Sequence, residues 1–199
     1  MVSAWVVFNY FPDLVRSMGT SNYGTLMKPV KLPVTGLIDV NGKSLPADIF
    51  EKKWTYVYFN TGECDRTCFD HLMIIKNVRL SQGKEVSRMK RLFVIASGKV
   101  NDGMRDTLAK FPSMRTVLLN SDEQRALMQK TFATEDKQDP FTSNAIYIVD
   151  PDSKVMMHYK EEKVKVKKLE GMEKDSILGL AKGMQGDMAK LMKNSQLRK

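Results

Sequence analysis

Two cysteines are the residues of this chain whose type and spacing are best suited to chemistry. Cys64 and Cys68 are the only cysteines among the 199 residues, and they lie four positions apart. At the rise of an α-helix their Cα atoms would be about 6 Å apart, a separation that a disulfide tolerates. The pair therefore predicts either reversible dithiol–disulfide exchange or binding of a soft metal such as Cu(I). Two free thiols packed without a function are the structural alternative.

A buried strand and a helix are expected to position this pair. Residues 54–60 (W-T-Y-V-Y-F-N) are β-branched and aromatic, which is typical of a strand covered on both faces. The spacing of Leu72, Ile75 and Leu80 predicts a helix over residues 66–80. Reaction sites in open α/β sheets lie beyond the carboxyl ends of the strands, and the cysteines follow such an end.

The two histidines of the chain have different surroundings. In a helix that ran through Cys64, His71 would share one face with both cysteines, so it is a candidate third copper ligand or a base for a thiol. A surface or capping role for His71 is the alternative. His158 follows Met156 and Met157, and alternate strand residues face opposite ways. We therefore interpret these methionines as core residues rather than metal ligands.

The remaining pattern alternates strands with helices. Further strands are predicted over residues 91–96, 116–119, 144–149 and 155–159, and further helices over 102–111, 121–132 (capped by Ser121) and 170–193. Asn41-Gly42 predicts a type I′ hairpin between residues 36–40 and 44–49. Residues 12–33 are predicted to form a loop, because Gly and Pro punctuate them. This order predicts one α/β domain with a mixed central sheet covered by helices.

Composition and charge exclude several classes of protein. A hydrophobic fraction of 42% excludes wholesale disorder, and two cysteines exclude a disulfide-dense scaffold or a four-cysteine zinc site. Residues 160–199 hold eleven Lys and Arg against six Asp and Glu, a net charge of +5 out of the +9 of the whole chain. A basic tail suits nucleic acid, an anionic membrane or an acidic partner, or is simply a solvated helix face. No nucleic-acid-binding motif accompanies it, so nucleic acid is not an expected partner.

The first eleven residues (M-V-S-A-W-V-V-F-N-Y-F) are apolar and aromatic. They lack the cationic start and the cleavage site of a signal peptide, and they are too short to span a bilayer. Two interpretations remain open. The segment is either the remnant of a membrane anchor, with aromatic residues at the interface, or an N-terminal strand or arm docked on the core.

The chain resembles the Sco/SenC family of cytochrome c oxidase assembly proteins. The resemblance is carried by the Cys-x-x-x-Cys motif and by residues 21–29, 53–59, 72–91, 145–159 and 188–197. It implies a thioredoxin-like domain over residues 34–199 with a basic C-terminal helix, preceded by an arm over residues 1–33. It also implies anchoring in the bacterial inner membrane, with the domain facing the periplasm.

The chain departs from this family at two places. The motif Cys-Asp-Arg-Thr-Cys lacks flanking prolines. Copper-binding members also have a histidine before the strand at residues 144–149, at a position near Thr142, whereas residues 139–144 contain no histidine. The usual copper triad is therefore incomplete. Either His71 or a methionine replaces the missing ligand, or the protein exchanges thiols and disulfides without stable copper.

Three functions follow as hypotheses. The first is a thiol-disulfide oxidoreductase in which Cys64 and Cys68 act on a cytochrome c oxidase subunit or another thiol protein. The second is a Cu(I) carrier with Cys64, Cys68 and His71 as ligands. The third is a non-catalytic accessory that docks on a membrane complex through its basic tail.

Overall fold

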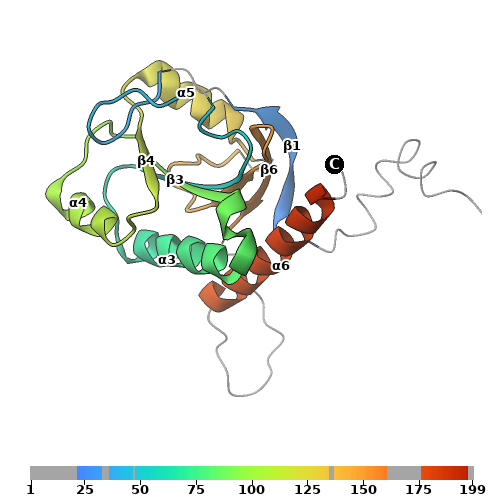
Figure 1. Cartoon of the computed structure of the whole chain (residues 1–199). Helices are drawn as coiled ribbons and strands as arrows, with labels where there is room; N and C mark the ends of the chain where they lie inside the picture. Colours follow the sequence, from blue (N-terminus) through green and yellow to red (C-terminus); the bar gives the residue numbers. More distant parts are fainter. Residues whose placement is uncertain (1–21, 33–35, 47, 135–136, 161–175, 197–199) are drawn as a thin grey trace, which may run out of the picture.

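A six-stranded sheet forms the centre of the computed structural model (Figure 1). The structure describes residues 22–32, 36–46, 48–134, 137–160 and 176–196. The strands are β1 (Thr25–Lys31), β2 (Trp54–Asn60), β3 (Met89–Ile95), β4 (Arg115–Leu118), β5 (Ile146–Val149) and β6 (Lys154–Tyr159). Their order across the sheet is β1-β6-β5-β2-β3-β4. Strands β2, β3 and β4 run parallel, whereas β5 is antiparallel to both β2 and β6, and β1 is antiparallel to β6. The predicted mixed α/β sheet is confirmed.

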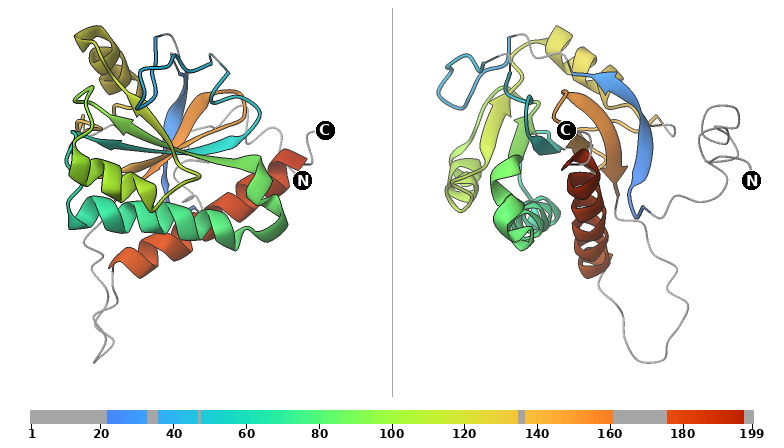
Figure 2. Two further views of the ribbon diagram at one scale, coloured as in Figure 1. Left: turned by 60° about the vertical axis from the view of Figure 1, so that its left-hand side comes forward. Right: turned by 45° about the vertical axis from the view of Figure 1, so that its right-hand side comes forward.

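Helices cover both faces of this sheet (Figure 2). They are α3 (Arg66–Ser81), the 3₁₀ helix η1 (Gly83–Arg88), α4 (Asp102–Ala109), α5 (Asp122–Thr131) and α6 (Ser176–Gln196). Helices α3, α4 and α6 lie on one face and α5 lies on the other. The predicted helices at these places are confirmed to within a few residues, although residues 170–175 of the last one lie outside the described part of the chain.

Strand β2 is buried along its whole length, as its composition predicts. Because successive side chains of a strand point to opposite faces, Tyr56 and Tyr58 join the core beneath α3 and α6. Val57 and Phe59 join the core beneath α5. The central strand thus holds the two halves of the core together and fixes where its carboxyl end lies.

The prediction of a loop over residues 12–33 is wrong for residues 25–31, which form strand β1. The strand could not be predicted because it is an edge strand, which in the described part of the chain pairs with β6 alone. Pro29 is tolerated there, since an edge strand has one side without ladder hydrogen bonds. Its side chains are mostly exposed, so no alternation of apolar and polar residues marks it. Residues 1–21, including the apolar segment 1–11, lie outside the described residues.

The predicted hairpin at Asn41-Gly42 is a different kind of turn. Gly42 has a φ of +77° but Asn41 does not have a positive φ, so the turn is not of type I′. The Gly42 N–H donates to the carbonyl of Asp39 (3.0 Å), and the Asp39 carboxylate accepts the N–H groups of Asn41 and Lys43. Asp39 therefore closes the turn with its side chain. The flanking strands are reduced to a bridge between Ile38 and Ser44.

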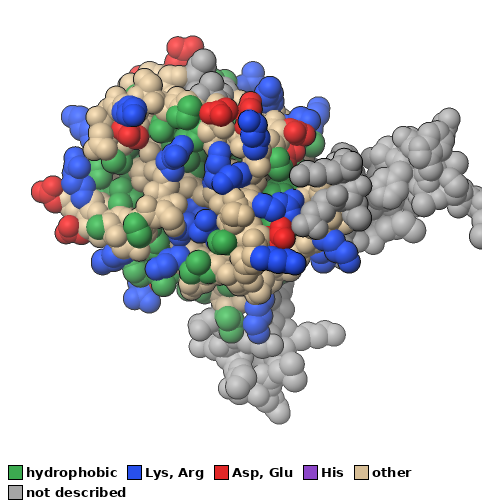
Figure 3. Space-filling model, in the orientation of Figure 1, with side chains coloured by type: hydrophobic (Ala, Val, Ile, Leu, Met, Phe, Trp, Pro, Cys, Tyr) green, Lys and Arg blue, Asp and Glu red, His purple; other side chains and the backbone are tan. Residues whose placement is uncertain are grey.

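The surface is rich in cations beyond the C-terminal tail. Figure 3 shows Lys and Arg side chains over the middle of the face drawn there, and Asp and Glu side chains mainly near its upper and left edges. The predicted concentration of charge in residues 160–199 falls partly on residues 161–175 and 197–199, which lie outside the described residues.

Candidate functional site

The two cysteines lie where β2 leads into α3, as the sequence predicts. Their sulfur atoms are joined in a disulfide, and their Cα atoms are 5.1 Å apart. Cys64 is partly exposed, whereas Cys68 is fully buried. The pair is therefore asymmetric, because only Cys64 has surface that another protein can reach.

The N-terminal cap of α3 sets this asymmetry. Asp65 has an extended backbone, and its Oδ1 accepts the N–H of Cys68 at 2.8 Å, which makes it the cap residue. The helix consequently begins at Arg66, and Cys64 lies outside it. The expectation of a helix face shared by both cysteines and His71 is therefore wrong. Cys68 and His71 are helical residues three positions apart, while Cys64 is brought to Cys68 by the preceding loop.

A tight turn shapes that loop. The Asn60 side chain, at the end of β2, accepts the N–H of Gly62 at 2.7 Å. Gly62 has a φ of +133°, and a Cβ added there would lie 2.6 Å from Oγ of Ser97, in the loop after β3. A side chain at this position would be strained and would collide with Ser97. The glycine thus lets the loop that carries Cys64 lie against the neighbouring loop.

His71 is a core residue in this structure. It is 1% exposed, and its ring centroid lies 5.4 Å from that of Tyr58 on β2. Among the described residues no three His, Cys, Asp or Glu side chains gather into a group that could hold a metal ion. Copper binds to thiolates, and a disulfide offers none. The disulfide form therefore does not fit a copper ion, and the role of His71 as a ligand remains a prediction.

Tyr58 links this helix to the loop that precedes β5. Its hydroxyl donates to Oδ1 of Asn144 at 3.0 Å, and its ring stacks on Phe93 with centroids 5.9 Å apart. Strands β2 and β5 are antiparallel, with Tyr58 opposite Ile146, so the start of β5 lies beside the end of β2. The loop that lacks the expected histidine therefore lies at the same edge of the sheet as the cysteines.

Tyr58 and Asn144 lie at this site but were not predicted to belong to it. Both fell inside predicted strands, where an aromatic or polar residue carries no special signal. Asn144 has a φ of +53°, a conformation in which Asn is several-fold enriched over most residues. Thr142, at the position where the family histidine was expected, is exposed.

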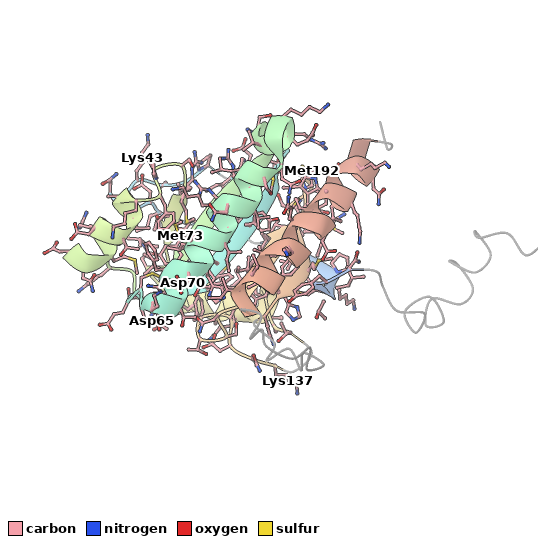
Figure 4. The ribbon with its side chains drawn as sticks, turned by 90° about the horizontal axis from the view of Figure 1, so that it is seen from below. Lys43, Asp65, Asp70, Met73, Lys137 and Met192 are labelled. Carbon is pink, nitrogen blue, oxygen red and sulfur yellow. A yellow bond between two sulfur atoms is a disulfide. The ribbon has the colours of Figure 1, made fainter. Side chains whose placement is uncertain are left out.

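Charged residues lie at the beginning of α3, next to the cysteines in the sequence. Figure 4 labels Asp65 and Asp70 near the beginning of α3, with Met73 further along the helix. Arg66 donates to Asp70 at 2.9 Å, and its side chain is 87% exposed. An exposed pair of this kind contributes little to stability.

The other histidine lies elsewhere in the fold. His158, on β6, is 7% exposed, and its ring centroid lies 6.1 Å from that of Tyr147. Met157 is buried in the core, and Met156 packs against the core while remaining partly exposed. These residues form part of the packing between strands, as the sequence predicted, and are not brought to the cysteines.

Comparisons with known structures identify the same fold. A SCO1/SenC family lipoprotein from Bacillus anthracis is 14% identical, has a TM-score of 0.55, and the match covers 81% of this chain and 98% of that one. Arabidopsis thaliana ScoI with copper bound is 15% identical at a TM-score of 0.54, covering 83% and 99%. Apo Sco1 from Thermus thermophilus is 19% identical at a TM-score of 0.52, covering 70% and 87%. At these identities the resemblance to the Sco/SenC family is confirmed for the fold.

Two comparisons of the sequence with known proteins, and one property of the helices, bear on the family of this chain. No curated protein matches the chain significantly. In the described part of the chain, no helix combines the length and apolar character that a membrane crossing requires. A family model described as transmembrane-like, thioredoxin-like, C-terminal domain matches residues 54–174, which include β2, both cysteines and β6. The chain therefore belongs to this family of transmembrane-like, thioredoxin-like domains.

Proposed function

We propose that the protein is a thiol-disulfide oxidoreductase that works through Cys64 and Cys68. The observation that carries the proposal is the disulfide between a partly exposed and a fully buried cysteine, at the carboxyl end of a central strand. A thiol pair with one accessible and one buried sulfur suits the two steps of disulfide exchange.

The exposed cysteine carries out the first step. In the reduced protein, the Cys64 thiolate attacks one sulfur of a client disulfide, and the other client sulfur leaves as a thiolate that takes up a proton. Cys68, 0% exposed, then loses its proton and attacks the Cys64 sulfur. This step forms the intramolecular disulfide and releases the second client thiol. Two electrons pass to the client, and a dithiol reductant must supply two electrons for the next cycle.

The client class follows from the resemblance to Sco/SenC proteins. That family acts in cytochrome c oxidase assembly, so we propose that the clients are cysteines of an oxidase copper centre or of another thiol protein in the same assembly. Anchoring of the domain in the bacterial inner membrane through the N-terminal segment, with the domain facing the periplasm, is part of the same proposal. The transmembrane-like family and the lipoprotein relative support membrane association.

Single-cysteine variants test the mechanism. We expect Cys64→Ser to abolish reduction of a disulfide-bonded client peptide, because no attacking thiol remains at the surface. Cys68→Ser keeps the attacking thiol, so it should accumulate a mixed disulfide that mass spectrometry detects. Thr61→Ser, in the same loop, is the matched control and should exchange normally. Equal activity of Cys64→Ser and the native protein would overturn the proposal.

Delivery of Cu(I) is the second candidate, since Arabidopsis thaliana ScoI, which shares the fold, has copper bound. Here copper is cargo, and the reduced Cys64 and Cys68 would hold it with His71 or a weaker ligand. Titration of the reduced protein against a Cu(I) chelator tests this function. Retention of less than one equivalent, or an affinity that His71→Ala leaves unchanged, would count against it.

A further inference from the structure

Exposed apolar side chains gather on two segments of the described chain. Of the seven large apolar side chains that are exposed there, five come from residues 23–30 and from the first turn of α6, namely Tyr23, Leu26, Val30, Ile177 and Leu178. Leu178 is 52% exposed and Tyr23 is 46% exposed. Single exposed apolar residues are ordinary in proteins, whereas a gathering of them is typical of an interaction surface.

These two segments lie against each other. Tyr23 and Gly24 each donate a backbone N–H to Oδ2 of Asp187 in α6, at 2.9 Å. A Cβ added to Gly183 would lie 2.1 Å from the ring of Tyr23, so this ring rests on the backbone of α6. Figures 1 and 2 show β1 and α6 side by side. The exposed residues of 23–31 and of α6 therefore form one surface, which we name the β1–α6 surface.

Every exposed charge of the described β1–α6 surface is positive. Residues 22–32 and 176–196 contain one carboxylate, that of Asp187, and five lysines. Asp187 is 2% exposed, and its Oδ2 accepts three hydrogen bonds within the chain. All five lysines are exposed, namely Lys28, Lys31, Lys182, Lys190 and Lys193. A surface with cations and without exposed carboxylates attracts an anionic partner.

The outer face of α6 carries both kinds of side chain. Residues 178, 182, 186, 189 and 193 follow the spacing of one helix face, and all of them are exposed. Leu178 lies near the beginning of this face, and Lys182 and Lys193 follow along it. A Cβ added to Gly186 would meet no atom within 4 Å, so this face is open. The opposite face of the helix is buried in the core through Leu180, Met184 and Met188.

We propose that the β1–α6 surface lies on a membrane that contains anionic lipid. Aliphatic and tyrosine side chains among lysines suit the lipid interface, because a lysine stem covers apolar surface while its ammonium group reaches the lipid phosphates. The apolar segment 1–11 favours a membrane over an acidic protein as the partner. Residues 12–22 can span at most about 40 Å, so Tyr23 stays close to a membrane that holds this segment. The inference rests on the membrane association in the proposed function and is independent of thiol exchange.

Sedimentation of the full chain with lipid vesicles tests the proposal. Vesicles of phosphatidylcholine measure binding through the apolar N-terminal segment, and vesicles with about one third phosphatidylglycerol add the effect of charge. We expect binding to be about tenfold tighter on the anionic vesicles, and this gain should disappear in about 1 M NaCl. Lys182→Glu combined with Lys193→Glu should weaken binding to anionic vesicles about tenfold and leave binding to phosphatidylcholine unchanged. Leu178→Ala should weaken it about threefold.

Lys99→Glu combined with Arg105→Glu is the matched control. It changes the net charge by the same amount at exposed positions after β3 and in α4, which lies across the domain from α6 and β1 in Figure 1. This variant should bind anionic vesicles nearly as the native protein does. Equal binding of the native protein to neutral and anionic vesicles would overturn the proposal, and so would a Lys182 and Lys193 variant that binds no more weakly than the control. Loss of binding to phosphatidylcholine alone would instead count against anchoring through residues 1–11.

Discussion

Two buried charges of this protein have opposite surroundings. Asp187, in α6, is 2% exposed, and its Oδ2 accepts the N–H groups of Tyr23 and Gly24 at 2.9 Å and the hydroxyl of Tyr159 at 3.2 Å. Arg91 is 4% exposed and makes one hydrogen bond while two of its donors lack partners. The hydrogen bonds of Asp187 are therefore satisfied within the chain, whereas two donors of Arg91 have no partner among the described residues.

The difference indicates which charge is structural. Asp187 connects α6 to the residues that directly precede β1. These two segments are more than 160 residues apart in the sequence. Gly183 of the same helix leaves room for the Tyr23 ring, because a Cβ there would lie 2.1 Å from it. The carboxylate thus holds the edge strand against α6. Arg91 makes a single hydrogen bond, to Ser113 in the connection between α4 and β4.

The largest effect on stability is expected for substitution of Asp187, whose carboxylate accepts three hydrogen bonds. Asp187→Ala removes the acceptor of three hydrogen bonds, two of them buried, so it should lower the free energy of unfolding by about 3–5 kcal/mol. Asp187→Asn keeps an acceptor oxygen and should cost clearly less. Urea unfolding followed by circular dichroism measures both variants. An equal loss for the two would show that the hydrogen bonds are not what stabilises β1 on α6.

Alkaline pH should lower the stability of the region around Asp187, because two buried tyrosines lie there. Burial raises the pKa of Tyr159 well above its usual 10.0, with further contributions from Tyr56 and Asp187, and burial and Asp187 raise the pKa of Tyr56. A raised folded-state pKa contributes stability that is fully present below pH 10 and is lost as pH rises through 10, where the unfolded chain releases its protons.

Urea unfolding between pH 8 and 11 measures this loss. Tyr159→Phe removes one of the titrating groups, so its stability should fall less steeply with pH than that of the native protein. Identical pH dependence of the two proteins would contradict the assignment.

Substitution of Arg91 should change the free energy of unfolding in the opposite direction. Arg91→Met removes a buried cation that has no ion-pair partner among the described residues and replaces it with an apolar side chain of comparable length, next to core residues. We expect it to raise the free energy of unfolding by about 1–3 kcal/mol. A loss of stability would mean that the chain itself satisfies Arg91, and the contrast with Asp187 would disappear.

The smallest expected effect concerns the cap of α3. Asp65→Ala removes the acceptor for the Cys68 N–H and should cost about 1 kcal/mol of stability. Asp65→Asn is the control, since Asn caps helices equally well. If both substitutions destabilise equally in urea unfolding, the negative charge rather than the cap hydrogen bond is responsible.

Much of the fold could be predicted because the signals are local. The uniformly buried composition of β2, the spacing of apolar residues in α3 and the cap at Ser121 of α5 each depend on neighbouring residues, and the structure confirms them. Strand β1 could not be predicted in this way. Its stability comes from pairing with β6 and from Asp187, both of which lie far away in the sequence.

The site could be predicted only in part, because only some of its features depend on residues that are neighbours in the sequence. The cysteine pair at a strand-to-helix junction is visible in the sequence because its two members are four residues apart. The start of the helix after Cys64 depends on Asp65 as the cap, which the apolar spacing does not reveal. The contacts of His71 with Tyr58, and of Tyr58 with Asn144, depend on how α3 and β5 lie against β2.

The sequence by itself determined the α/β class, the central strand and the place of the two cysteines, because each follows from residue types over a few positions. Only the tertiary structure decided which cysteine is exposed, that His71 packs in the core, and that Arg91 lacks a counterion. Burial and charge compensation depend on residues from separate segments, and these become neighbours only when the strands pair and the helices pack on them.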